Sequence, residues 1–273
     1  AGDDAADYDQ LKGLLWQALH PGRPPLPGTT PSMKPTPCDC SCSGLSGGSV
    51  TSVAAGPLIV GGATVLAELI KVMPNEDFIY FGDSKNAPYG TKTVERVREL
   101  TISNAEWLFK RGIKGLVIAC NTATAAAAHC LREVHRDVPI IGIEPAVKPA
   151  ALAKENSTVI VMATPLTLKQ EKFMTLLHLY TDRAHIIPLP CPGLADLIEK
   201  GNFDSEQIHA YLRKIFEPFN REKIDSIVLG CTHYPLISNA IRREFGRNVS
   251  IFYGGEGTAR NTRKRLGDFG LLR

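Results

Sequence analysis

Two cysteines occupy the same place in two copies of one local pattern. The segment IKGLVIACNT spans Ile113–Thr122, and the segment IDSIVLGCTH spans Ile224–His233. In each copy an apolar, strand-like run ends in a small residue, then a cysteine, then polar side chains that can cap a helix. Two thiols facing one cleft can remove a proton from one side of a carbon atom and return one to the other. We therefore interpret Cys120 and Cys231 as candidate acid–base groups of a cofactor-free enzyme.

Each of these cysteines lies between a predicted strand and the start of a predicted helix. Asn121 or Thr122 can cap the first helix, and Thr232 can cap the second. Because a helix N-terminus favours negative charge, we expect the pKa of both thiols to fall below the usual ~8.5. The alternative is a structural role, since cysteine is commonly buried in cores. Cys130 and Cys191 lack the pattern and are interpreted as structural.

Metal binding is a weaker interpretation of these cysteines. The imidazole of His233 is two residues from Cys231, and the sequence has no CxxC pair, so zinc is not expected there. A separate CxCxC tract, Cys38 to Cys42, gives a further hypothesis of a soft-metal or redox element.

The composition indicates an ordinary globular protein. The chain has 273 residues, of which 44% are hydrophobic and 22% charged, and its net charge is +3. This charge is too small and too scattered to indicate nucleic-acid binding. No apolar run reaches the ~18 residues of a membrane span, and the acidic N-terminus lacks the apolar core of a signal peptide. With seven cysteines and no disulfide framework, a reducing cytoplasm is the expected location.

The first 56 residues differ from the rest of the chain. Prolines crowd the stretch from Pro21 to Pro37, and small polar residues fill Cys38–Ser49. We expect residues 1–56 to form a Pro/Ser/Gly-rich appendage that is extended or disordered.

From Pro57 onward, strand-like and helical segments alternate. The predicted strands are Phe78–Ser84, Leu116–Ala119, Val138–Ile143, Ser157–Met162, Ile224–Leu229 and Val249–Phe252. The first of these strands runs into a loop. The predicted helices are Val94–Phe109, Thr124–Val134, a short one after Ile143, Leu168–Tyr180, Leu194–Lys200, Ser205–Phe216, Ile237–Phe245 and Gly257–Leu266. This alternation predicts an α/β fold with parallel sheets covered on both faces, and ligands beyond the carboxyl ends of the strands.

Further polar segments lie at other predicted strand ends. The loop GDSKNAPYGTKT, Gly82–Thr93, is rich in turn formers whose backbone amides could hold a carboxylate. Glu144 lies in GIEPAV, and Thr164 and Thr167 lie in ATPLT. Helix capping, or a solvated charge for Glu144, is the alternative interpretation of these residues.

Taken together, these segments resemble the glutamate racemases of the aspartate/glutamate racemase superfamily. The matching pieces are YFGDSKNAPYGTKT, ACNTATAAA, GIEPA, ATPLT and LGCTHYPLI, in the family's order, across Pro57 to Leu272. The resemblance implies cofactor-independent, two-base interconversion of L- and D-glutamate, which supplies D-glutamate for bacterial peptidoglycan.

The resemblance also implies roles for individual residues. Cys120 would act on D-glutamate and Cys231 on L-glutamate, with Glu144 and His233 assisting the thiols. The implied substrate-binding residues are Asp83, Ser84, Pro88, Tyr89, Gly90, Asn121, Thr122, Thr164, Thr167 and Thr232.

The implied fold has two pseudo-symmetric lobes, each a mainly parallel sheet flanked by helices, with the active site in the cleft between them. The first lobe would comprise residues 57–143 plus 253–273, and the second residues 144–252. Glutamate is the expected partner, and a homodimer is a further hypothesis.

One motif of the resemblance is missing. Family members carry an FDSGVGGLTV-like sequence, whereas this chain has Pro57 and Leu58 where the Asp and Ser belong. The preceding strand is also replaced by Ser- and Gly-rich sequence, so we expect the first lobe to lack its central strand. The alternative function is therefore a catalytically impaired racemase-fold protein that binds an amino acid or a protein partner.

Overall fold

Two parallel four-stranded sheets organise the protein. The computed structural model describes residues 50–55, 59–219, 223–246 and 248–273, and residues 50–273 form one unit by their contacts. The first sheet has the order β2–β1–β3–β4, and its strands are β1 (Val50–Ala55), β2 (Phe78–Phe81), β3 (Ile113–Ala119) and β4 (Ile140–Gly142). The second has the order β6–β5–β7–β8, and its strands are β5 (Ser157–Ala163), β6 (Ala184–Pro190), β7 (Ser226–Leu229) and β8 (Ser250–Tyr253). Every neighbouring pair is parallel.

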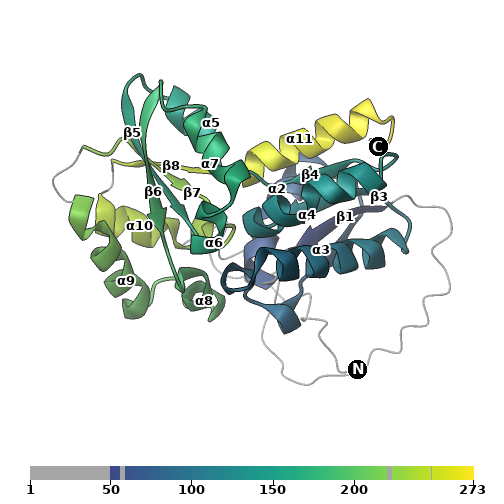
Figure 1. The fold of residues 1–273 in the computed structure, drawn as a ribbon, viewed down its shortest axis with the longest axis horizontal. Coiled ribbons are helices and arrows are strands. Elements are labelled where there is room, and N and C mark those ends of the chain that lie inside the picture. Colours follow the sequence, from purple (N-terminus) through teal and green to yellow (C-terminus); the bar gives the residue numbers. More distant parts are fainter. Residues whose placement is uncertain (1–49, 56–58, 220–222, 247) are drawn as a thin grey trace. The chain divides into compact units, whose positions relative to one another are not determined.

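Helices cover both faces of the first sheet (Figure 1). These helices are α2 (Ile59–Val72), α3 (Val94–Phe109), α4 (Asn121–Val134) and α11 (Gly255–Asp268). On β3, Leu116 and Ile118 pack in the core cluster that contains α3 and α4, whereas Val117 and Ala119 pack in the cluster that contains α2 and α11. Successive side chains of a strand point to opposite faces, so a strand covered on both sides is apolar throughout.

The second sheet is built in the same way. Its helices are α5 (Val147–Leu152), α6 (Pro165–Leu168), α7 (Glu171–His178), α8 (Leu194–Glu199), α9 (Glu206–Phe216) and α10 (Ser238–Phe245). On β5, Ile160 and Met162 pack with α8, α9 and α10, and Val159 and Val161 pack with α5 and α7. The predicted α/β fold class with flanked parallel sheets is confirmed. Within the described residues, no helix is both long and apolar enough to cross a membrane.

The central strand of the first sheet is present, so the prediction that this lobe lacks it was wrong. The backbone of β1 lies between β2 and β3, with Thr51 opposite Phe78 and Ser52 opposite Leu116. The sheet therefore begins at Val50, before the boundary expected at residue 57. The replaced motif at Pro57 and Leu58 lies outside the described residues, as does the CxCxC tract.

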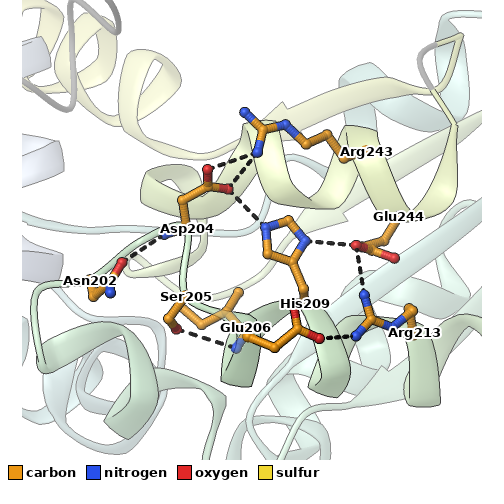
Figure 2. Close-up of polar contacts among 9 residues, drawn as sticks. Asn202, Asp204, Ser205, Glu206, His209, Arg213, Arg243 and Glu244 are labelled. Atoms are coloured by element: carbon orange, nitrogen blue, oxygen red, sulfur yellow. Dashed lines mark hydrogen bonds and ion pairs between the residues drawn. The ribbon is translucent and has the colours of Figure 1, made fainter.

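A charged network joins α9 to α10 and to the loop before α9. Figure 2 shows the imidazole of His209 between two carboxylates: Nε2 lies 2.8 Å from Asp204 Oδ1, and Nδ1 lies 2.6 Å from Glu244 Oε1. Arg243 pairs with Asp204, and Arg213 lies 3.4 Å from Glu244. The hydrogen bond to Asp204, and after it the bond to Glu244, raise the pKa of His209 against the opposing effect of partial burial. Because both ring nitrogens face carboxylates, the arrangement favours the doubly protonated imidazolium.

Candidate active site

The two cysteines of the repeated pattern line one cavity. Cys120 directly follows β3 of the first sheet, and Cys231 lies two residues after β7 of the second. The cavity has a volume of about 100 Å³. Other predicted site residues that line it are Pro88, Tyr89, Gly90, Asn121, Thr122, Thr164, Thr167, Thr232 and His233. The arrangement therefore places a thiol from each lobe on the same small space.

Cys120 is the N-cap of α4, a position that the sequence had assigned to Asn121 or Thr122. Its Sγ accepts a hydrogen bond from the backbone N–H of Ala123 at 3.5 Å. Burial raises the pKa of the Cys120 thiol to about 11, and the backbone hydrogen bond from Ala123 only partly opposes this, while the nearby Cys231 raises it further. The expectation of a lowered pKa was therefore wrong for this thiol, because desolvation outweighs the helix N-terminus.

Cys231 has a different environment, because it lies beside an imidazole. Its Sγ is 3.5 Å from Nδ1 of His233, and Nε2 of His233 is 2.9 Å from Oε2 of Glu199. Burial lowers the pKa of His233, but Cys231 and the Glu199 carboxylate raise it more, to about 9. Thr232 does not cap the 3-10 turn that follows, since that turn begins after His233 without a side-chain cap. The three side chains form a chain from the thiol to a carboxylate.

The start of α2 packs directly against this imidazole. A Cβ atom at Gly61 would lie 2.3 Å from Cε1 and 2.5 Å from Nδ1 of the His233 ring. The hydroxyl of Thr64, one turn further along α2, donates to the backbone carbonyl of Thr232 at 3.0 Å. The first lobe thus fixes the turn that carries Cys231, and glycine at position 61 leaves room for the ring.

Polar groups of the cavity come from both lobes. The hydroxyls of Thr122, Thr164 and Thr167 lie near one another, with Thr167 Oγ1 3.0 Å from Thr122 Oγ1 and 2.9 Å from Thr164 Oγ1. Thr164 also caps α6 by accepting from the N–H of Thr167. The side-chain oxygen of Asn121 is buried and accepts no hydrogen bond. A buried acceptor without a donor is costly, so a ligand N–H in this cavity would satisfy it.

Three predicted site residues do not line this cavity. Glu144 pairs with Lys172 at 3.2 Å, and about half of each side chain is exposed to solvent. Asp83 is buried and accepts hydrogen bonds from its own loop, and Ser84 begins a 3-10 turn in that loop. The structure therefore does not bring Glu144 to the thiols. The carboxylate that lies beside His233 is that of Glu199.

Glu199 and Cys191 are residues of this site that sequence reasoning missed or set aside. Glu199 ends α8 and has no local signal, because it reaches His233 only through the packing of α8 against the turn after β7. Cys191 lines the cavity together with the two candidate thiols, although it is 1% exposed, and burial raises its pKa to about 12. Its position directly after β6 could have indicated proximity to the other strand ends.

Among the described residues, no group of three or more His, Cys, Asp or Glu side chains is arranged to hold a metal ion. The chemistry that this cavity offers on its own is proton transfer by two thiols, supported by hydroxyl and amide groups that can orient a small polar ligand.

The sequence and the fold of this chain both have known relatives. The family model described as Asp/Glu/Hydantoin racemase matches residues 63–259, and the chain belongs to this family. Its relatives include the glutamate racemases of Clostridium perfringens (strain SM101 / Type A), 51% identical over 76% of this chain and 80% of that protein, and of Clostridium botulinum (strain Loch Maree / Type A3), 50% identical over 78% and 83%.

Solved structures lead to the same class of protein. A glutamate racemase isoform from Bacillus anthracis superposes with a TM-score of 0.73 at 32% identity, covering 82% of this chain and 84% of that one. The Escherichia coli glutamate racemase, solved with L-glutamate and the activator UDP-MurNAc-Ala, gives 0.73 at 28% identity over 80% and 83%. The resemblance drawn from the motifs is confirmed at the level of the family.

Proposed function

We propose that this protein interconverts L- and D-glutamate without a cofactor, with Cys120 and Cys231 as the two bases. The observation that carries the proposal is that thiols from the ends of β3 and β7, in different sheets, line one cavity. The curated relatives at about half identity bear the name of this activity. As in that class of enzyme, the D-glutamate formed would be used for peptidoglycan. We infer a cytoplasmic location for this enzyme.

The proposed reaction moves one proton off Cα and another one on. A thiolate takes the proton from one face, leaving a planar carbanion, and the opposite thiol gives its proton to the other face. The imidazole of His233, held by Glu199, carries a proton beside the Cys231 sulfur and so stabilises the thiolate form of Cys231. Cys120, with its pKa near 11, holds its proton in the substrate-free protein and is ready to donate it.

The cavity also supports the binding of an amino acid. Asn121 offers its unsatisfied side-chain oxygen to an ammonium group. The hydroxyls of Thr122, Thr164 and Thr167 and the backbone of the loop that contains Pro88 and Gly90 offer donors to carboxylates. Two carboxylates and one ammonium are the charged groups of glutamate.

The test is the optical activity of L-glutamate during incubation with the protein in deuterium oxide. Racemisation should abolish the circular dichroism signal, and the D-glutamate formed should carry deuterium at Cα. Cys120→Ser and Cys231→Ser should each lower kcat by about a thousandfold or more, because a serine hydroxyl is a poor base at neutral pH. Cys130→Ser is the matched control, since Cys130 does not line the cavity. Unchanged optical activity at high protein concentration would refute the proposal.

The second candidate function is an impaired racemase-fold protein that binds an amino acid or a protein partner. It is favoured by one observation, the Pro57–Leu58 pair in place of the family's Asp and Ser. Under this alternative, glutamate raises the melting temperature while no deuterium enters Cα. Light scattering of the same sample would show whether the protein is a homodimer.

A further inference from the structure

The loop Gly82–Thr93 forms one wall of the cavity but reaches it with only part of its residues. It contains two 3-10 turns, Ser84–Asn86 and Tyr89–Thr91. Residues 88–91 line the cavity, and a Cβ atom at Gly90 would lie 3.4 Å from the Thr164 side chain of the other lobe. This short segment therefore lies against the other lobe where both lobes border the cavity.

Asp83 acts on the loop instead of on the cavity. The residue is 6% exposed, and its carboxylate accepts hydrogen bonds from Tyr89 Oη at 2.7 Å and from Asn86 Nδ2 at 2.8 Å. A buried carboxylate must be satisfied by donors, and here those donors come from the turn itself. The carboxylate thus draws the two 3-10 turns together and leaves no free oxygen directed at a ligand.

Asn104, in the middle of α3, connects this arrangement to the core. Its Nδ2 lies 3.2 Å from Asp83 Oδ2 and 3.2 Å from Tyr89 Oη. The amide nitrogen has two hydrogens, so it can donate to both oxygens and close a triangle with the 2.7 Å bond between them. On the same helix, the neighbouring Ala105 and the nearby Leu108 are buried in the core cluster that also contains Tyr89.

We propose that Asn104 is a positioning residue that holds Tyr89, through Asp83 and directly, so that residues 88–91 stand at the correct distance from the thiols. The kinetic test of this role rests on the proposed function, because it measures KM for glutamate. Asn104 does not line the cavity and has no acid–base role, so its loss should act on substrate binding more than on proton transfer.

The kinetic test compares Asn104→Ala with Thr101→Val. Thr101 is a buried polar residue one turn earlier on α3, and its hydroxyl bonds within the helix to the carbonyl of Val97. In Asn104→Ala, KM for glutamate should rise about tenfold with kcat within about twofold, as expected for a lost pair of hydrogen bonds at a binding wall. Thr101→Val should leave KM unchanged. Asn104→Gln, which keeps the amide donor, should recover part of the lost affinity.

A second readout does not depend on racemase activity. Tyr89 and Cys120 pack in the same core cluster, so a displaced Tyr89 should expose the thiol. We expect iodoacetamide to alkylate Cys120 about tenfold faster in Asn104→Ala than in the wild type or in Thr101→Val, as followed by peptide mass spectrometry. If the wild type proves unable to racemise glutamate, the proposed function fails while this measurement still tests the positioning role.

Tyr89→Phe gives the variant to use if Asn104→Ala does not fold. It removes the shared hydroxyl and keeps the ring, and it should raise KM and the alkylation rate in the same direction. Where both fold, the effect of the double variant should be smaller than the sum of the two single effects, because both changes remove the bond between Asn104 and Tyr89. Additive effects, or an Asn104→Ala protein with the KM and the alkylation rate of Thr101→Val, would overturn the proposal.

Discussion

Replacing Glu199 by glutamine should move the alkaline limit of activity toward neutral pH. The wild-type carboxylate lies 2.9 Å from Nε2 of His233, and the imidazole lies 3.5 Å from the Cys231 sulfur. Glutamine has nearly the same shape but no charge, so the substitution removes the anion without opening a cavity. The substitution leaves the buried imidazole beside Cys231 but without its carboxylate partner.

The size of the effect follows from the two interactions. Burial alone would lower the pKa of His233, and Cys231 and Glu199 together raise it to about 9. A hydrogen bond to a charged partner contributes about 1.5–3 kcal/mol, which corresponds to a roughly 10- to 150-fold change in acidity. A group with a raised pKa is protonated below that pKa and loses its proton as the pH rises through it. The alkaline limb of kcat, near pH 9 in the wild type, should therefore move down by about one to two pH units in Glu199→Gln.

The assay is the pH dependence of kcat and kcat/KM, measured from both enantiomers. L- and D-glutamate have equal free energies in water, so the loss of kcat/KM must be the same in both directions. Glu144→Gln is the discriminating control, because Glu144 pairs with Lys172 and does not line the cavity. A limb that stays in place in Glu199→Gln, or that moves in Glu144→Gln instead, would falsify the assignment of Glu199.

Two further predictions concern packing and charge. Gly61→Ala should lower kcat about a hundredfold, because the added methyl group would lie 2.3 Å from the His233 ring and force the ring to move by about 1 Å. Gly257→Ala is the control and should have wild-type activity, because no neighbouring atom lies within 4 Å of a Cβ at this position. His209→Leu should lower the free energy of unfolding by about 1–3 kcal/mol near pH 6, because Glu244 and Asp204 each lose their hydrogen bond to the imidazole. Since the carboxylates raise the pKa of His209, this stabilisation is complete below about pH 6.5 and disappears as the pH rises through the raised pKa. Urea unfolding of both proteins between pH 5 and 9 checks this, and a difference that grows with pH would contradict it.

The elements that the sequence predicted well carry strong local signals. Thr93 and Ser205 stand one residue before α3 and α9, and each side chain accepts a hydrogen bond from a backbone N–H of the first turn. The missed strands have weak signals. The β6 segment contains Pro188 and Pro190, which are tolerated because β6 is an edge strand of its sheet. The short, Ala- and Ser-containing segment Val50–Ala55 becomes a strand because β2 and β3 offer it a ladder on both sides.

The candidate site shows the same division between local and tertiary information. Residues at strand ends were found because parallel strands bring their carboxyl ends together, and the cavity unites most of them. Glu144 also follows a strand, yet its side chain pairs with Lys172 near the surface. Glu199 lies at the end of a helix, where a solvated carboxylate is the ordinary outcome. Only the packing of α8 against the turn that carries His233 gives it a role, and no spacing along the chain encodes that packing.

The repeated pattern gives two thiols that look equivalent, and the structure makes them unequal. Cys120 caps a helix, but burial dominates and raises its pKa to about 11. Cys231 has an imidazole at 3.5 Å, itself held by a carboxylate, and the raised pKa of this imidazole keeps a positive charge beside the sulfur. Substrate binding must lower the cost of ionising Cys120, because that thiol has to serve as the base for one enantiomer. The ammonium group of a bound amino acid is a positive charge that could lower this cost in the small cavity. Cys231 differs because it has the charged imidazole of His233 beside it before any ligand binds.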